Sequence, residues 1–150
     1  KSKRGQAIRD VAKGLVGRRQ AGWVEGRLGL LIDGTGKDYR KIQKLRGSLD
    51  EIGYDTYMLF VNTSLDVALQ RNAMRTRKLD ATEVEIMWKA VQENMGKFQL
   101  LFGRRNFILI DNNSASEDVF DKLFVQIKTL VDEPVTSKAA LGWIRSQLPD

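Results

Sequence analysis

The 150-residue chain is long enough for one hydrophobic core, with 42% apolar residues, and its formal net charge is +6. It contains neither cysteine nor histidine, which excludes disulfide frameworks, thiolate nucleophiles, imidazole bases and His-ligated zinc. No apolar run reaches membrane-spanning length and no signal-peptide pattern opens the chain, so we expect one soluble, cytoplasmic domain over residues 1–150 with no membrane partner.

The positive charge is concentrated in the first 27 residues, where eight Lys or Arg residues stand against two acidic residues. This segment accounts for the whole net charge, because residues 28–150 hold 17 basic and 17 acidic residues. Apolar residues at helical spacing predict a basic N-terminal helix over 6–21. Such a segment can bind nucleic acid, a ligand's phosphates or a protein partner, and the plain alternative is a solvated helix face.

The next element is predicted from residues 28–33 (LGLLID), an apolar run that stops at Asp33 and is followed at once by Gly34, Thr35 and Gly36. We expect this run to be a strand of a parallel sheet, which places Asp33 at the carboxyl edge of that sheet. An acid in that position can hold Mg²⁺ beside phosphates. The alternative is that Asp33 caps the turn through backbone N–H groups. Lys37 either contacts a phosphate or stays exposed to solvent.

Beyond the turn, strands alternate with helices. A helix is expected over 38–52, ending at Gly53, and a strand over 54–62. The later expected elements are helices over 65–77, 82–102, 116–132 and 137–148 and a strand over 106–110. This order predicts a three-layer α/β fold, with a small parallel sheet flanked by helices and with Asp33 and Asp111 at one edge. Residues 134–150 follow as a helical extension.

Three arginines follow the expected strand 54–62. Arg71 and Arg75 are four residues apart, so a helix over 65–77 places both guanidinium groups on one face, with Arg77 just beyond. Neighbouring guanidinium groups are suited to phosphate binding. The alternative is pairing on the surface with Asp66 or with acids of the next helix.

The polar run Asp111, Asn112 and Asn113 follows the last expected strand. Because it comes directly after a buried strand, it lies at the edge where ligands bind in open α/β sheets, and it can line a base pocket. The alternative is a polar turn before the next helix, which Ser116 is expected to start.

Taken in order, these segments resemble the P-loop kinases of the zeta-toxin type over about residues 28–113. The matching pieces are Leu30–Gly36 (LLIDGTG), Gly53–Tyr57 (GYDTY), the strand MLFVNT and the helix SLDVALQRNAMRTR. The resemblance implies a strand that ends in a DGT-like turn, an arginine lid over the nucleotide, and a last core strand whose loop touches adenine.

The resemblance also implies ATP and Mg²⁺ as cofactors. It implies catalytic roles for Asp33, Arg71 and Arg75, with Asp33 also as the metal ligand. The cofactor-binding residues that it implies are Gly34, Thr35, Gly36, Arg77, Asp111, Asn112 and Asn113. A nucleotide or a phosphorylated small molecule is the partner expected for such a site.

The chain departs from this family because no GxxxxGK[ST] phosphate loop is present. Gly36 and Lys37 do not complete one, since Leu31 stands where the first glycine belongs and Asp38 where Ser or Thr belongs. ATP and Mg²⁺ are therefore expected only if the loop is supplied elsewhere. One hypothesis is a kinase-like nucleotide-binding domain, either part of a larger kinase or a degenerate one. The other is a non-catalytic nucleic-acid-binding or assembly module on the same scaffold.

Overall fold

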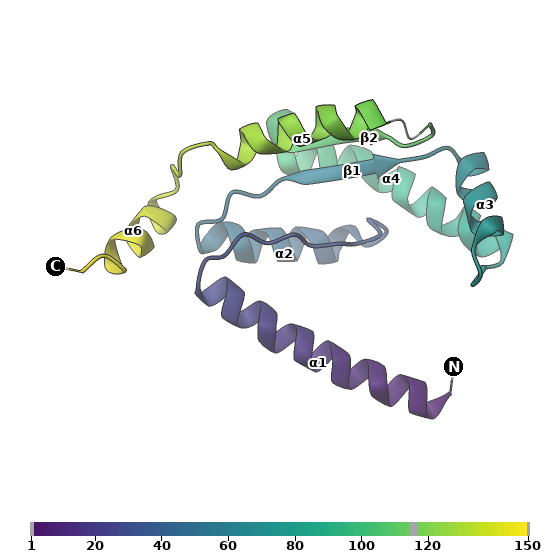
Figure 1. The fold of residues 1–150 in the computed structure, drawn as a ribbon, viewed down its shortest axis with the longest axis horizontal. Helices are drawn as coiled ribbons and strands as arrows, with labels where there is room; N and C mark the ends of the chain where they lie inside the picture. Colours follow the sequence, from purple (N-terminus) through teal and green to yellow (C-terminus); the bar gives the residue numbers. More distant parts are fainter. Residues whose placement is uncertain (1, 115–116, 150) are drawn as a thin grey trace. The chain divides into compact units, whose positions relative to one another are not determined.

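The computed structural model describes residues 2–114 and 117–149, and the chain divides into two compact units, Lys1–Gly34 and Thr35–Asp150. The first unit consists of helix α1 (Lys3–Glu25) and the segment after it (Figure 1). Ser2 caps α1, because its hydroxyl oxygen accepts a hydrogen bond from the Gly5 N–H at 3.1 Å. The predicted basic helix is thus confirmed and is longer than expected at both ends.

The strand predicted over 28–33 is wrong. These residues have no strand structure, Leu31 is 94% exposed and Asp33 is exposed. A strand exists through backbone hydrogen bonds to a neighbouring strand, and an apolar run of residues does not show that such a neighbour is present. Asp33 therefore does not end a strand of the sheet. The prediction that strand ends place Asp33 and Asp111 at the same edge of the sheet is wrong for Asp33.

The second unit alternates helices with two strands (Figure 1). Its elements are α2 (Tyr39–Glu51), β1 (Met58–Asn62), α3 (Leu65–Met74), α4 (Ala81–Asn106), β2 (Phe107–Asp111), α5 (Glu117–Val131) and α6 (Lys138–Ser146). The two strands pair in parallel, with Met58 opposite Phe107 and Asn62 opposite Asp111. The described residues therefore form a mixed α/β fold that is mostly helical, which is not the P-loop fold that was expected.

Local signals explain most of the helix boundaries. The carboxylate of Asp38 caps α2 by accepting a hydrogen bond from the Lys41 N–H at 3.0 Å, and Ser64 caps α3 in the same way. Gly53 follows the last turn of α2 with a φ of +97°, a conformation that L side chains rarely adopt. Gly103 interrupts the helical conformation near the end of α4, at the predicted position. The start of α5 expected at Ser116 lies outside the described residues.

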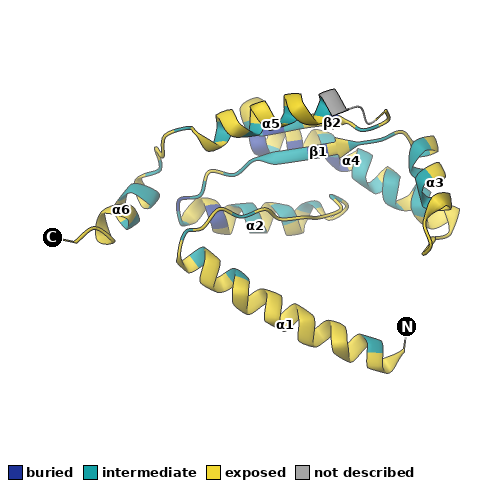
Figure 2. Cartoon of the chain, viewed as in Figure 1, coloured by how far each residue is buried: buried dark blue, intermediate teal, exposed yellow. Residues whose placement is uncertain are grey.

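Aromatic side chains build the core between α2, α4 and the strands. Phe98 of α4 is fully buried, and the Phe60 and Tyr39 rings lie 6.4 and 5.6 Å from it. Phe60 and Phe107 lie diagonally across the two strands, with ring centroids 5.7 Å apart, since Phe60 pairs with Leu109 and Phe107 with Met58. Figure 2 shows the buried positions on the strands, α4 and α2, and an almost entirely exposed α1. Each buried aromatic side chain stabilises the fold by roughly 1.5–3 kcal/mol.

The turn after α2 packs closely against α6. A Cβ atom at Gly53 would lie 2.5 Å from the Ala140 nitrogen and 2.9 Å from its Cα. Real Cβ atoms do not approach backbone atoms this closely, so glycine is required here by both contact and conformation. This contact fixes the C-terminal helix to the turn after α2.

Candidate functional site

The loops that follow the two strands emerge at one edge of the sheet, because the strands are parallel and in register. They are joined there by hydrogen bonds. The Ser64 N–H donates to Asn113 Oδ1 at 2.7 Å, and the Asn112 N–H donates to the Asn62 carbonyl at 2.8 Å. The carboxyl edge is therefore a single connected surface rather than two separate loops.

The carboxylate of Asp111 is occupied by its own turn. Asp111 Oδ1 accepts hydrogen bonds from the Asn113 N–H at 2.9 Å and from Asn113 Nδ2 at 2.7 Å. These bonds form the polar turn that was one of the two alternatives for this run. Contact of Asp111, Asn112 and Asn113 with an adenine base remains a prediction.

Arg71 is the cationic side chain that the structure places at this edge. Its Nη2 donates to the Asn112 carbonyl oxygen at 2.7 Å, and the side chain is partly buried. Among the side chains that the structure describes, at residues 2–114 and 119–149, no carboxylate forms an ion pair with Arg71, so the expected alternative of pairing with Asp66 is not observed. A guanidinium group has five N–H donors. The described hydrogen bond to the Asn112 carbonyl thus holds the group in place through one of its five donors.

Arg75 and Arg77 do not share a helix face with Arg71, which corrects the prediction of a helix over 65–77. Helix α3 ends at Met74, and Arg75 has extended backbone angles. Asn72 explains the early end, because its side chain accepts from the Leu79 N–H at 3.0 Å and donates to the Leu79 carbonyl at 2.9 Å. Residues 75–80 therefore form a loop closed by Asn72.

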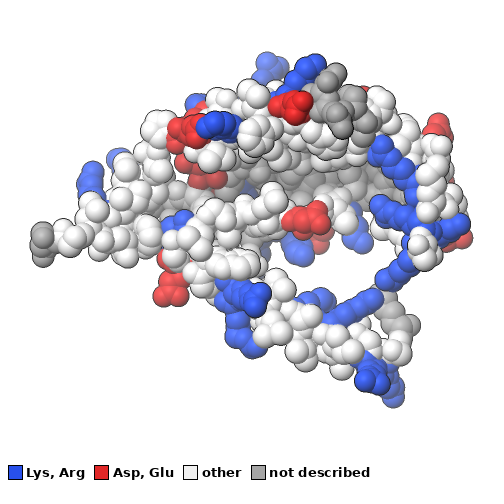
Figure 3. Space-filling model, viewed as in Figure 1, with Lys and Arg blue, Asp and Glu red and all other residues white. Residues whose placement is uncertain are grey.

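Basic side chains gather over this loop. Figure 3 shows Lys and Arg over α3 and the segment that follows it. Arg75, Arg77 and Lys78 are all exposed, in contrast to the partly buried Arg71. A lid function for the arginines remains a prediction, now with Arg71 at the fixed edge and the other two on a loop.

Helix α4 carries polar side chains that hold the carboxyl-edge segments. Trp88 Nε1 donates to the Thr63 carbonyl at 2.8 Å, and Gln92 Nε2 donates to Asn62 Oδ1 at 2.7 Å. Asn94 Nδ2 donates to the carbonyl oxygens of Gly36 at 3.1 Å and Lys37 at 3.0 Å. None of these roles was predicted. The available signal was Asn94 itself, a polar residue on the apolar stripe that includes Val91, Met95 and Phe98.

The turn before α2 is set against the core. Gly36 has a φ of +71°, and a Cβ there would lie 3.8–4.0 Å from side-chain atoms of Phe98, Val91 and Phe60. Lys37 is exposed to solvent, which was one of the two alternatives for this residue, and contact with a phosphate was the other. Thr35 belongs to this unit, whereas Gly34 and Asp33 belong to the first. A common site for Asp33 and Arg71, which their implied catalytic roles require, therefore stays a prediction.

The fit of these residues to Mg²⁺ and ATP is incomplete. The described residues contain no group of three or more acidic side chains arranged to hold a metal ion, and the Asp111 carboxylate is engaged within its turn. Mg²⁺ is normally held by one or two carboxylates together with substrate phosphates. The sequence also lacks a phosphate loop, whose backbone N–H groups normally cradle the phosphates beside Mg²⁺. Binding of ATP and Mg²⁺ stays a prediction for the case in which the loop is supplied elsewhere.

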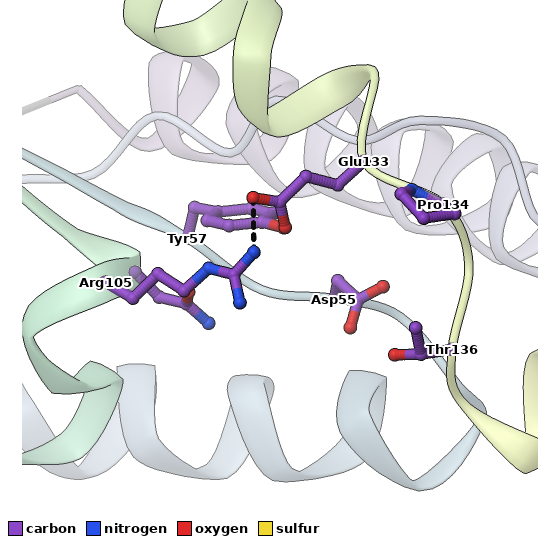
Figure 4. Close-up of a pocket in the computed structure, with 7 residues that line it drawn as sticks. Asp55, Tyr57, Arg105, Glu133, Pro134 and Thr136 are labelled. Atoms are coloured by element: carbon purple, nitrogen blue, oxygen red, sulfur yellow. Dashed lines mark hydrogen bonds and ion pairs between the residues drawn. The ribbon is translucent and has the colours of Figure 1, made fainter.

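A hollow of about 270 Å³ lies at the opposite, amino end of the strands (Figure 4). Its lining residues are Asp55, Tyr57, Arg105, Asn106, Glu133, Pro134 and Thr136. Arg105 Nη2 donates to Glu133 Oε1 at 2.6 Å, so the cation here is neutralised. Burial, helped by the negative charges of Glu133 and Asp55, raises the pKa of Tyr57. This hollow links the segment after α5 to the sheet and is not suited to an anion.

Comparisons with protein-family models, with curated proteins and with solved structures gave no match. Among the helices that the structure describes, none combines the length and the apolar character needed to cross a membrane.

Proposed function

We propose that this chain is a kinase-like phosphate-binding module whose anion site lies at the carboxyl edge of the β1–β2 sheet. The observation that carries the proposal is the hydrogen bond that holds Arg71, a partly buried guanidinium group, to the Asn112 carbonyl, with no carboxylate partner among the side chains described at residues 2–114 and 119–149. A partly desolvated cation gains more from an anionic ligand than a cation in bulk water does.

The surroundings of Arg71 favour phosphate among possible anions. The site follows parallel strands, where α/β proteins bind phosphorylated ligands, and the exposed cations of the loop 75–80 lie just beyond it in the chain. The resemblance to zeta-toxin-type kinases over residues 28–113 supports the same interpretation, with a nucleotide as the ligand.

The proposal concerns ligand binding rather than phosphoryl transfer by residues 1–150. Phosphoryl transfer depends on positioning and on charge stabilisation around the moving phosphoryl group, which a phosphate loop and Mg²⁺ normally provide. ATP and Mg²⁺ serve as cofactors only where such a loop is supplied elsewhere. We therefore assign Arg71 to binding and assign no step of the reaction to this chain alone.

Calorimetric titration with ATP and inorganic pyrophosphate tests the proposal. Arg71→Ala should weaken binding at least tenfold, because charge-assisted hydrogen bonds contribute roughly 1.5–3 kcal/mol. Arg105→Ala is the matched control, since it removes an arginine that is already neutralised by Glu133 at the opposite end of the strands. Equal affinities for wild type and Arg71→Ala would refute the proposed site, as would an equal loss in the control.

A second candidate function is nucleic-acid binding by α1, and the exposure of its basic side chains favours it. Its basic residues and its apolar positions Ile8, Val11, Leu15 and Val16 are all exposed, and no ion pair described in the structure involves α1. The six cations within the helix are Lys3, Arg4, Arg9, Lys13, Arg18 and Arg19. A row of exposed cations fits the phosphate backbone of a polynucleotide.

Anisotropy titration of a labelled 20-mer oligonucleotide at several salt concentrations tests this candidate. Replacing Arg9 and Arg18 with Ser should reduce the slope of log K against log salt by about 0.7–0.9 for each phosphate group that the helix no longer neutralises. The control replaces Lys122 and Lys138, which are exposed residues of the charge-neutral region. If both double variants change the slope equally, α1 is not the binding element.

A further inference from the structure

The main chain of Leu109, in the middle of β2, faces away from β1. The Asn112 N–H donates to the Asn62 carbonyl at 2.8 Å, so residue 112 turns toward β1. Main-chain groups of successive residues point alternately to the two sides of a strand, so Ile110 and Ile108 also turn toward β1 and Leu109 turns outward. In the described part of the chain, β1 is the only strand that pairs with β2, and no hydrogen bond is described for the N–H or the carbonyl of Leu109. The outer edge of β2 can therefore accept a further strand.

A hollow of about 510 Å³ lies along this open edge. Its lining includes Phe107, Ile108 and Leu109 of β2, Val125 of α5, and Arg104. Because neighbouring residues of a strand point to opposite faces of the sheet, a hollow that touches three consecutive residues lies at the edge of the strand rather than on one face. Leu109 is 50% exposed and Val125 is 63% exposed. An extended segment in this hollow would therefore cover apolar side chains and pair with the main chain of β2.

The two ends of β2 carry opposite charges. Arg104, near the amino end, is exposed and has no ion pair among the described side chains. Asp111, at the carboxyl end, is also exposed, and its described hydrogen bonds use Oδ1, which leaves Oδ2 for another partner. A second copy of β2 that runs antiparallel about Leu109 places Phe107 of each copy opposite Asp111 of the other. Each carboxylate then lies toward the arginine end of the other copy, which stabilises this pairing.

We infer that this chain forms a twofold-symmetric dimer in which β2 of each copy pairs antiparallel with β2 of the other, so that two sheets become one four-stranded sheet. Leu109 lies on the symmetry axis, where the two copies exchange both N–H···O bonds. The outer edge of β1 has no comparable charge pattern, because Asp55 precedes it and the neutral Asn62 ends it. The inference is independent of the proposed phosphate site.

A single introduced thiol tests the pairing, because the chain contains no cysteine. At the symmetry axis the Cα atoms of the two Leu109 residues would be about 5.5 Å apart, a distance that a disulfide bridges. Leu109→Cys should therefore form a covalent dimer under a mild oxidant such as diamide, as seen on a non-reducing gel. Val61→Cys is the matched control and should stay monomeric. Val61 is 56% exposed, and its main chain faces outward from β1, since the carbonyl of the next residue, Asn62, faces β2.

Sedimentation equilibrium measures the dimer without a cross-link, and the mass of the wild-type chain should approach twice the monomer mass as its concentration rises. Leu109→Pro removes the outward N–H of β2, and Val61→Pro removes the equivalent N–H of β1. Both substitutions leave the hydrogen bonds between β1 and β2 in place. Leu109→Pro should raise the dissociation constant of the dimer about tenfold or more, because the two bonds at the axis are lost. Val61→Pro should leave the dissociation constant unchanged.

Leu109→Lys gives a second test that keeps the main chain intact, so it reports on the interface even where Leu109→Pro does not fold. It places two like charges opposite each other at the axis and should weaken the dimer, more at low salt than at high salt. Three results would each overturn the inference. They are a wild-type chain that is monomeric at every concentration, Leu109→Cys that cross-links no faster than Val61→Cys, and a wild-type dissociation constant in Leu109→Lys. A dimer that the Val61 variants weaken instead would also overturn it, because the interface would then lie at β1.

Discussion

Replacing Gly53 with alanine should be one of the most destabilising single-methyl changes in this protein. The added Cβ would lie 2.5 Å from the Ala140 nitrogen and 2.9 Å from both its Cα and Cβ. Two of these neighbours are main-chain atoms, so no side-chain rotation relieves the contact. The Gly53 φ of +97° adds a second penalty, because alanine rarely adopts that conformation.

The magnitude follows from these two effects. A left-handed backbone costs a non-glycine residue about 1–2 kcal/mol. Overpacking adds about 1–3 kcal/mol. The reduced entropy of the unfolded chain returns about 0.4–1 kcal/mol. We expect a net loss of roughly 2–4 kcal/mol, a large share of the 5–15 kcal/mol by which typical domains are stable.

Gly103→Ala is the matched control. Gly103 also has a positive φ, of +76°, but a Cβ there has no neighbour within 4 Å. Its replacement should therefore show a conformational cost without a contact, about 1–3 kcal/mol for a φ of +76° with a ψ of 164°, less the roughly 0.4–1 kcal/mol that the unfolded state returns. The difference between the two variants measures the contact between the turn after α2 and α6.

Urea unfolding followed by circular dichroism measures the two free energies. Fluorescence in a Trp23→Phe, Trp88→Phe background, which leaves Trp143 as the one tryptophan, reports on α6, in which Trp143 lies. Gly53→Ala should shift the Trp143 emission to longer wavelength at zero urea, because α6 leaves its contact before the core unfolds. Equal destabilisation in both glycine variants, with unchanged emission, would show that α6 does not pack against this turn.

Two further predictions concern the amino-end hollow and the arginine loop. Burial and the negative charge of Glu133 raise the pKa of Tyr57 in the folded state. The contribution of the Tyr57 hydroxyl to stability is therefore complete below about pH 10 and is lost as pH rises through the folded-state pKa. The free energy of unfolding should accordingly fall less steeply above about pH 10 in Tyr57→Phe than in wild type. Matching slopes in urea titrations from pH 8 to 11 would contradict this assignment. Asn72→Ala removes both hydrogen bonds to Leu79, so amide hydrogen exchange over residues 75–80 should accelerate and stability should fall by about 1–2 kcal/mol. Unchanged exchange there would mean that Asn72 does not close the loop.

The amino-acid sequence alone predicted the features that depend on composition or on residues a few positions apart in the chain. The charge difference between the first 27 residues and the rest follows directly from the sequence, and so does the absence of cysteine and histidine chemistry. Helix α2 and strand β2 were predicted within one residue of their observed bounds, because apolar periodicity, Asp38 and Gly53 act over a few residues. Strand β1 was predicted with its observed end at Asn62, but its start at residue 54 was too early, since the strand begins at Met58. Parallel pairing of the strands followed from the long helical connection between them.

Only the tertiary structure decided which segments meet. Residues 28–33 have the composition of a strand but no partner strand in the described chain, because composition carries no information on long-range backbone hydrogen bonds. Arg71 and Arg75 look equivalent in the sequence, yet helix α3 ends between them and only Arg71 is held by the Asn112 carbonyl. Asn94 finds its partners 57 and 58 residues away, at Lys37 and Gly36, a separation that local patterns cannot bridge.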